Sequence, residues 1–85
     1  MSYTVSISRK AQKSLSKIPA EMQNKIINKI RDLATNPHPR SAKKLSGREA
    51  WRIRIGLYRV IYEIHNDVLS IVIIMIAHRK NVYKK

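Results

Sequence analysis

The chain contains no cysteine, and this absence excludes two kinds of protein. Without thiols there is no disulfide framework of the kind that stabilises small secreted domains, and there is no thiolate metal site. Long hydrophobic runs are also missing. The longest, residues 68–77, is far shorter than the roughly 20 residues that a bilayer-spanning helix needs, and the N-terminus holds no apolar stretch of signal-peptide length. We therefore expect a cytoplasmic protein.

Acidic residues are scarce: the 85 residues include 5 Asp or Glu against 18 Lys or Arg, which gives a net charge of +13. So large an excess on so small a body creates a positive field that concentrates polyanions and speeds their capture. Nucleic acid is the first candidate partner and an acidic protein is the second. A purely solubilising surface is the remaining interpretation, but ordinary domain surfaces mix both signs of charge.

The same scarcity disfavours a metal-dependent hydrolase. The three histidines, His38, His65 and His78, show no metal-ligand spacing, and few carboxylates are available to complete a site. His38 and His65 stand in turn contexts typical of loop residues. We expect neither a metal ion nor another cofactor.

The first half of this single domain, residues 1–85, predicts one strand and two helices. Apolar and polar residues alternate over residues 3–8, which indicates a half-buried strand. Ser8 can cap the helix that follows. Pro19 breaks that helix and can open a second one at its first turn. Apolar residues at helical spacing over 22–34 give the second helix a broad buried face, so the two helices form a hairpin with one shared buried side.

The second half predicts strands. Residues 41–47 are basic and indicate a loop or a short edge strand. Apolar and other residues alternate over 51–55 and over 58–64, which predicts two strands joined by a tight connection at Gly56-Leu57. Residues 68–77 are nearly all apolar, which predicts a central strand covered on both sides. The order indicates an α+β fold, in which an N-terminal strand and a two-helix hairpin pack with a mainly antiparallel sheet, the hairpin on one face.

Period-two geometry predicts a cationic sheet face. Trp51 belongs to the apolar set that faces the helices, whereas Arg52 and Arg54 point the other way. If the next strand pairs as a hairpin, Arg59 and Glu63 join them on the open face. Guanidinium groups repel one another but hold phosphate bidentately, so this cluster favours an anionic ligand over an ordinary solvated strand face.

The C-terminal segment adds further chemistry-bearing residues. His78, Arg79 and Tyr83 follow the last strand, so we expect them near the same edge of the sheet. Histidine titrates near neutrality, and a tyrosine can stack on a base or transfer a proton. Lys43 and Lys44 are candidates for non-specific phosphate contact.

These residues occur in an order that resembles the RelE toxins of the RelE/ParE superfamily of toxin–antitoxin systems, and the resemblance covers essentially the whole chain. The motifs that carry it are Leu15-x-x-Ile18-Pro19, Lys44-Leu45-x-Gly47, Arg52-Ile-Arg54, Gly56-x-Tyr58-Arg59-Val60-Ile61-Tyr62-Glu63 and His78-Arg79-x-x-Val82-Tyr83.

The resemblance implies an mRNA interferase that enters the ribosomal A site and cuts the exposed codon by metal-independent attack of the 2′-OH. It also implies a cognate RelB-like antitoxin that covers the basic surface. By position, Arg52 and Arg54 match the pair that grips the phosphate backbone, and Arg59 matches the transition-state arginine. Arg79 matches the C-terminal catalytic arginine, and Tyr83 the tyrosine that stacks or acts as base.

The resemblance does not decide which residues transfer the protons. His78 stands where some members carry histidine and others lysine. Arg52 and Arg54 stand where some members carry lysine, and arginine does not deprotonate at physiological pH, so these two cannot be bases. Some members use a carboxylate base in an earlier strand, and Glu49 or Glu63 could fill that role only by analogy.

Two other functions compete with the ribonuclease. The ParE branch shares the fold but resembles a non-enzymatic inhibitor of DNA gyrase and lacks the basic catalytic constellation. The other alternative is a nucleic-acid-binding module without chemistry. The presence of all five matching residues favours the nuclease: Arg52, Arg54, Arg59, Arg79 and Tyr83.

Overall fold

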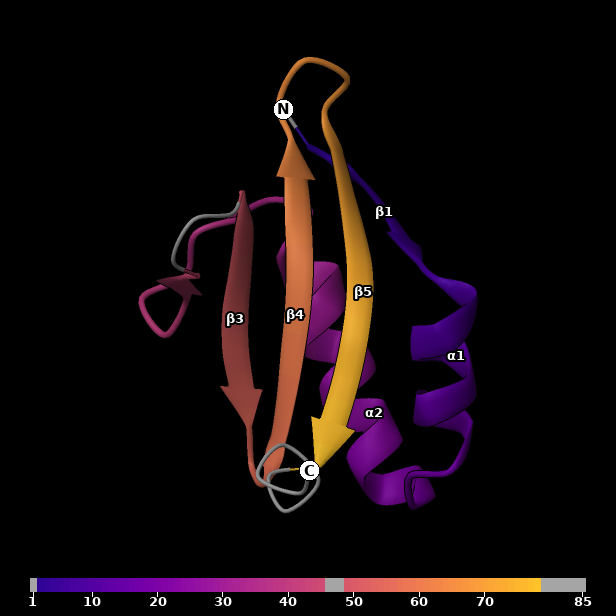
Figure 1. Cartoon of the computed structure of the whole chain (residues 1–85). Helices are drawn as coiled ribbons and strands as arrows, with labels where there is room; N and C mark the ends of the chain where they lie inside the picture. The colour runs from indigo at the N-terminus through magenta and orange to yellow at the C-terminus, as the bar shows by residue number, and fades with distance from the viewer. Residues whose placement is uncertain (1, 46–48, 79–85) are drawn as a thin grey trace.

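The computed structural model describes residues 2–45 and 49–78 and has an α+β fold. Figure 1 shows the helices on one face of the sheet, with α2 behind β4 and β5 and α1 beside β5. The predicted fold class is confirmed. The elements in chain order are β1 (Thr4–Ile7), α1 (Arg9–Ser16), α2 (Ala20–Asp32), β2 (Lys43–Lys44), β3 (Ala50–Ile55), β4 (Tyr58–His65) and β5 (Ser70–His78).

The sheet has the strand order β1-β5-β4-β3-β2. Three of its pairings are antiparallel, and β1 pairs with β5 in parallel. The register of β1 runs only from Thr4 opposite Ser70 to Ile7 opposite Ile73, so the second half of β5 has no β1 residue beside it. Residues 41–47, predicted as a loop or a short edge strand, contribute the two-residue edge strand β2.

Local sequence signals set the ends of the helices. The Ser8 side chain accepts a hydrogen bond from the Ala11 N–H at 3.1 Å, which confirms the predicted cap. Pro19 stands one position earlier than predicted: it is the residue before α2, in an extended conformation, and α2 starts at Ala20. Proline has no backbone N–H, but this costs no helical hydrogen bond here, because the first N–H groups of a helix have no intrahelical partner.

The prediction for residues 68–77 was wrong in two respects. The strand begins at Ser70, and Val68 and Leu69 lie in the turn before it, with Val68 67% exposed. The strand is also buried on one face only, through Ile71, Ile73 and Ile76. Both helices pack on that face, and no element within residues 2–45 and 49–78 covers the other.

The core lies between the helices and this face of the sheet. Tyr62 in β4 is fully buried there, and its hydroxyl donates a hydrogen bond to the Pro37 carbonyl at 2.8 Å. Burial raises the pKa of Tyr62 to about 12. The largest fully buried side chains are those of Tyr62, Ile26, Leu33, Ile71, Ile73 and Val60.

We expect the buried Tyr62 hydroxyl to make stability fall at high pH. Between pH 10.0 and about 12 the unfolded chain releases the phenolic proton while the folded chain keeps it, so the free energy of unfolding decreases as pH rises. Tyr62→Phe should cost about 0.5–1.5 kcal/mol near neutrality, because its hydrogen bond is removed. Denaturant titrations across this range should show that the wild type and Tyr62→Phe differ less in free energy of unfolding as the pH rises above 10.0. A constant difference would contradict the prediction.

The turn between β4 and β5 holds a strained residue. Leu69 has a φ of 49°, in the left-handed region that costs an L-residue about 1–2 kcal/mol. We expect Leu69→Gly to raise the free energy of unfolding by roughly 0.5–1 kcal/mol, because glycine adopts this conformation without a Cβ clash. Val68→Gly is the matched control and should destabilise. Equal losses of stability in both variants, measured by thermal unfolding, would refute the assignment of strain.

Candidate nucleic-acid interface

Four cations share the open face of the sheet, and we call them the arginine face: Lys43, Arg52, Arg54 and Arg59. The register places Arg54 directly opposite Arg59 and Arg52 between Lys43 and Ile61. Trp51, Ile53 and Ile55 alternate with these arginines and pack toward the helices. The predicted grouping of the three arginines on the face away from the helices is therefore confirmed.

The clustering of arginines on this face does not stabilise the folded protein. Arg54 and Arg59 form a cross-strand pair with Cβ atoms about 5 Å apart, a spacing at which like charges destabilise a sheet. The Arg52 Nε is buried, and it makes no hydrogen bond in the described part of the chain. A buried donor without an acceptor costs about 1–3 kcal/mol. Phosphate oxygens carry negative charge, which offsets repulsion between the guanidinium groups, and they can accept a hydrogen bond from the Arg52 Nε.

The two candidate carboxylates occupy different places. Glu63 lies on the open face, one row beyond Arg52, opposite Ala50 and Val72. Glu49 precedes β3, and its Oε2 accepts a hydrogen bond from the Lys44 Nζ at 3.2 Å. Both side chains of that ion pair are exposed, so it contributes at most about 1 kcal/mol.

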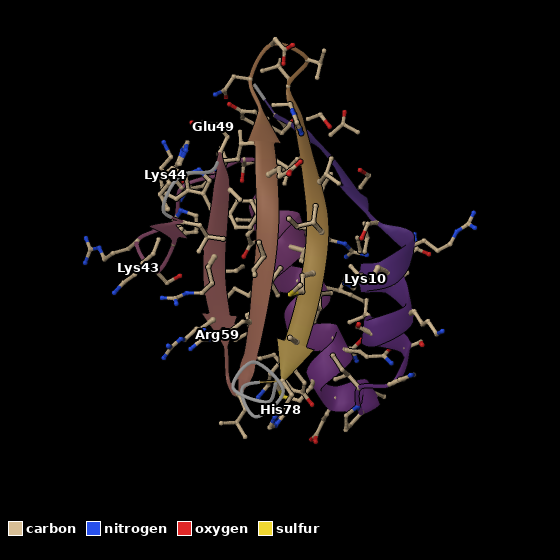
Figure 2. The ribbon with its side chains drawn as sticks, in the orientation of Figure 1. Lys10, Lys43, Lys44, Glu49, Arg59 and His78 are labelled. Atoms are coloured by element: carbon tan, nitrogen blue, oxygen red, sulfur yellow. The ribbon has the colours of Figure 1, made fainter. Side chains whose placement is uncertain are left out.

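Glu49 and Arg59 lie near opposite ends of β3 (Figure 2). Glu49 is five positions before Arg54, the cross-strand partner of Arg59, which corresponds to about 16 Å along a strand. The fold therefore does not bring Glu49 to Arg59. Glu63 is the nearer carboxylate on that face.

The two lysines of β2 lie on different faces of the sheet. Lys43 is in register with Arg52 and so belongs to the arginine face. Lys44 is in register with Trp51, the helix-facing residue, and its ammonium group binds Glu49. Of the two predicted phosphate contacts, only Lys43 is aligned with the arginines.

His78 does not join the arginine face. It is in register with Tyr58, whose ring packs against the core, and the two rings meet edge to face with centroids 5.1 Å apart. The cause is a β-bulge: Ile61 pairs with Met75 and Tyr62 with Ile73, so Ile74 is an extra residue on β5. An extra residue reverses the side on which every later side chain lies. His78 is thus turned to the helix-facing side, although it remains near the end of the sheet that carries Arg59 (Figure 2).

Arg79 and Tyr83, both predicted to be catalytic, lie outside the described residues. Sequence reasoning also missed one neighbour of the arginine face. His65 was interpreted as a loop histidine, but it is the last residue of β4, and its Nε2 lies 3.2 Å from the Glu63 Oε1. The signal was present, because two residues that are two apart in a strand share a face.

The described residues hold no group of three His, Asp or Glu side chains that could bind a metal ion. In this part of the chain, no helix has the length and apolar character needed to cross a bilayer.

Comparisons with known proteins identify the family to which the chain belongs. Residues 5–83 match the family model of the ParE toxin of the parDE type II toxin–antitoxin system. The RelE1 toxin of Methanocaldococcus jannaschii is 35% identical over 88 aligned positions, which cover 99% of this chain and 98% of the relative.

Solved toxin–antitoxin complexes contain chains with a similar fold. The RelE–RelB complex of Pyrococcus horikoshii contains a chain with a TM-score of 0.84 and 29% identity, covering 93% of this chain and 97% of that one. The RelBE2 toxin–antitoxin complex of Mycobacterium tuberculosis contains one with a TM-score of 0.82 and 28% identity, covering 93% and 100%. The fold, the match over nearly the whole length and the identity to a RelE toxin together show that the chain belongs to the RelE/ParE family of type II toxins.

Proposed function

We propose that this toxin is a metal-independent endoribonuclease that cuts mRNA in the ribosomal A site. The observation that carries the proposal is the arginine face, in which Arg54 and Arg59 are forced together and the buried Arg52 Nε makes no hydrogen bond within the described residues. Such a surface suits the phosphodiester backbone of a single strand. The identity to a RelE toxin supports the same conclusion.

Cleavage of RNA without a metal requires three tasks. The 2′-OH loses a proton as it attacks the adjacent phosphorus, the phosphorane is stabilised, and the 5′-oxygen leaving group gains a proton. Because cleavage depends on the 2′-OH, DNA is not a substrate. Arg59 is assigned to the phosphorane, because its charge is fixed and it stands among neighbouring cations. Arg79 is assigned to the same task from the C-terminal segment.

Binding of the strand is assigned to Arg52, Arg54 and Lys43, which line up across β3 and β2. Each is one of several phosphate contacts, so each contributes to affinity rather than to the chemical step. Lys44 has a lesser part, because its ammonium group is bound to Glu49.

Proton transfer is assigned first to Tyr83. Glu63 is the carboxylate that shares the arginine face, with His65 beside it. His78 would act from the helix-facing side of the strand end, and Glu49 from the far end of β3, so these two are the weaker candidates.

We further propose a RelB-like antitoxin as the cognate partner. The solved relatives from Pyrococcus horikoshii and Mycobacterium tuberculosis are toxin–antitoxin complexes. An acidic antitoxin segment would neutralise the arginine face, and exposed apolar residues such as Met75 on the same side of the sheet offer further area for contact. Binding there would block the strand and so inhibit cleavage.

The test is primer extension on mRNA from ribosomes programmed with a defined codon in the A site. Purified toxin should give a new 5′ end within that codon, and it should leave the same mRNA largely intact in the absence of ribosomes. Intact mRNA on saturated ribosomes would overturn the nuclease assignment, and toxin that binds RNA without cutting it would indicate a binding module.

A second candidate function is inhibition of DNA gyrase, because the matching family model is that of a ParE toxin. A supercoiling assay with purified gyrase separates the two. Loss of supercoiling activity together with intact ribosome-bound mRNA would establish the ParE-like function instead.

A further inference from the structure

One edge of the sheet is only partly covered, and a pocket lies beside the uncovered part. The short strand β2 pairs with Trp51 and Arg52, so within the described residues no strand pairs with the second half of β3 on that side (Figure 1). The preceding chain turns away, and the Ala42 N–H donates a hydrogen bond to the Pro39 carbonyl at 2.9 Å in this turn. Between β3, the turn and the C-terminal end of α2 is a pocket of about 320 Å³, which we call the edge pocket.

The edge pocket is continuous with the arginine face. Its lining includes Ile53 and Arg54, which are consecutive in β3 and point to opposite faces of the sheet. The pocket therefore extends around the edge of the sheet, and Arg54 belongs both to it and to the arginine face. An RNA strand whose phosphates lie on Arg52 and Arg54 would pass directly beside the pocket.

The polar lining of the edge pocket combines acceptors with donors. Asp32, the last residue of α2, offers two carboxylate oxygens, while Lys29 and Arg54 offer cationic donors. In the described part of the chain the Asp32 carboxylate makes no ion pair, so its oxygens are available to a ligand. The buried side chains of Leu33 and Ile53 add apolar surface. This combination suits a planar polar group better than a bare anion, which the carboxylate would repel.

We propose that the edge pocket binds one guanine base of the RNA strand that lies on the arginine face. The inference rests on the proposed function, because it takes that strand as the ligand, and it adds a preference for one nucleotide. Guanine carries two neighbouring donors, N1–H and the N2 amino group, which match the two oxygens of the Asp32 carboxylate. Its O6 accepts from a cation such as Lys29 or Arg54, and its ring covers the apolar surface.

The other bases fit the Asp32 carboxylate less well. Adenine and cytosine present one exocyclic amino group beside a ring nitrogen that accepts, so one carboxylate oxygen would face a lone pair. Uracil presents a single N–H between two carbonyl oxygens, which the carboxylate also repels. Asp32 is therefore the residue that selects guanine.

The test uses short strands of 2′-O-methyluridine that carry guanine, hypoxanthine, adenine or cytosine at one central position. These strands have no free 2′-OH, so they bind without being cleaved. Hypoxanthine is guanine without the N2 amino group and isolates one contact with Asp32. The affinity of the full-length toxin for each strand is measured at one salt concentration. The ratio of two affinities then cancels the general attraction between the protein and phosphates.

The wild-type toxin should bind the guanine strand about 10-fold more tightly than the hypoxanthine strand, because hypoxanthine lacks one hydrogen bond to a charged acceptor. Asp32→Asn should bring this ratio to within about twofold, because an amide has only one acceptor oxygen. The variant should melt no lower than the wild type, because a carboxylate at the C-terminal end of a helix is unfavourable. Asp67→Asn is the matched control: it removes the same charge from an exposed turn and should keep the ratio.

NMR spectra of the wild-type complex locate the base. The guanine strand should shift the methyl signals of Leu33 and Ile53, which line the edge pocket, and leave those of Ile7 in β1, the strand at the other edge of the sheet. Equal affinity for the guanine and hypoxanthine strands, or a preference for another base, would overturn the proposal. So would an unchanged ratio in Asp32→Asn, or the same loss in Asp67→Asn. Because these strands cannot be cleaved, uncut mRNA on ribosomes would refute the proposed function while leaving a guanine preference intact.

Discussion

Replacing Arg59 with alanine is expected to slow cleavage of ribosome-bound mRNA by about 10²–10³-fold at saturating toxin, or about 3–4 kcal/mol of transition-state stabilisation. The reason is that a fixed positive charge next to the reacting phosphate acts mainly as the phosphorane forms. The fold should survive, because Arg59 is not part of the core and its removal relieves repulsion with Arg54. We expect the free energy of unfolding to stay within about 1 kcal/mol of the wild type.

Arg54→Ala is the matched control, since the two arginines are cross-strand partners in the same field. It should weaken ribosome binding and lower activity at low toxin concentration, but leave the rate at saturation nearly unchanged. Single-turnover cleavage on programmed ribosomes distinguishes the two effects. If Arg59→Ala cuts at the wild-type rate under saturation, the assignment is wrong, and the chemistry must be sought among Arg79, His78 and Tyr83.

Replacing Trp51 with alanine is expected to have the largest effect on stability of the changes considered for this protein. The indole packs against the core, and the His38 ring meets it edge to face with centroids 4.6 Å apart. Because Trp51 is only partly buried, we expect a destabilisation near the lower end of the range for such substitutions, about 3 kcal/mol. For a domain of this size, that change corresponds to a fall in melting temperature of roughly 12–24 °C.

Arg52→Ala is the informative comparison, because Arg52 is the next residue and points to the opposite face. It should lower the free energy of unfolding by no more than about 1 kcal/mol, because the unsatisfied Nε is removed with the side chain, and it should weaken RNA binding. Thermal unfolding and RNA titration of both variants measure the two quantities side by side. If Trp51→Ala keeps its melting temperature but no longer binds RNA, the indole belongs to the binding surface, and the assignment of the two faces of β3 is reversed.

Much of the fold followed from local pattern in the sequence. Ser8 was identifiable as a helix cap because its hydroxyl can accept from the exposed N–H groups of the first turn. Alternation placed Arg52, Arg54 and Arg59 on one face, because side chains in a regular strand alternate strictly. The excess of positive charge indicated a polyanionic partner without reference to any particular fold.

Only the tertiary structure decided which faces are covered and where alternation is interrupted. The apolar pattern of β5 does not reveal that both helices lie on one side of it, because the number of layers above a strand depends on distant segments. The extra residue Ile74 turns His78 away from Arg59, and a bulge is set by the pairing of two strands rather than by either one alone. The same packing brings Asp32 and Arg54 to one pocket, and local periodicity cannot specify such an arrangement because the two residues are far apart in the chain.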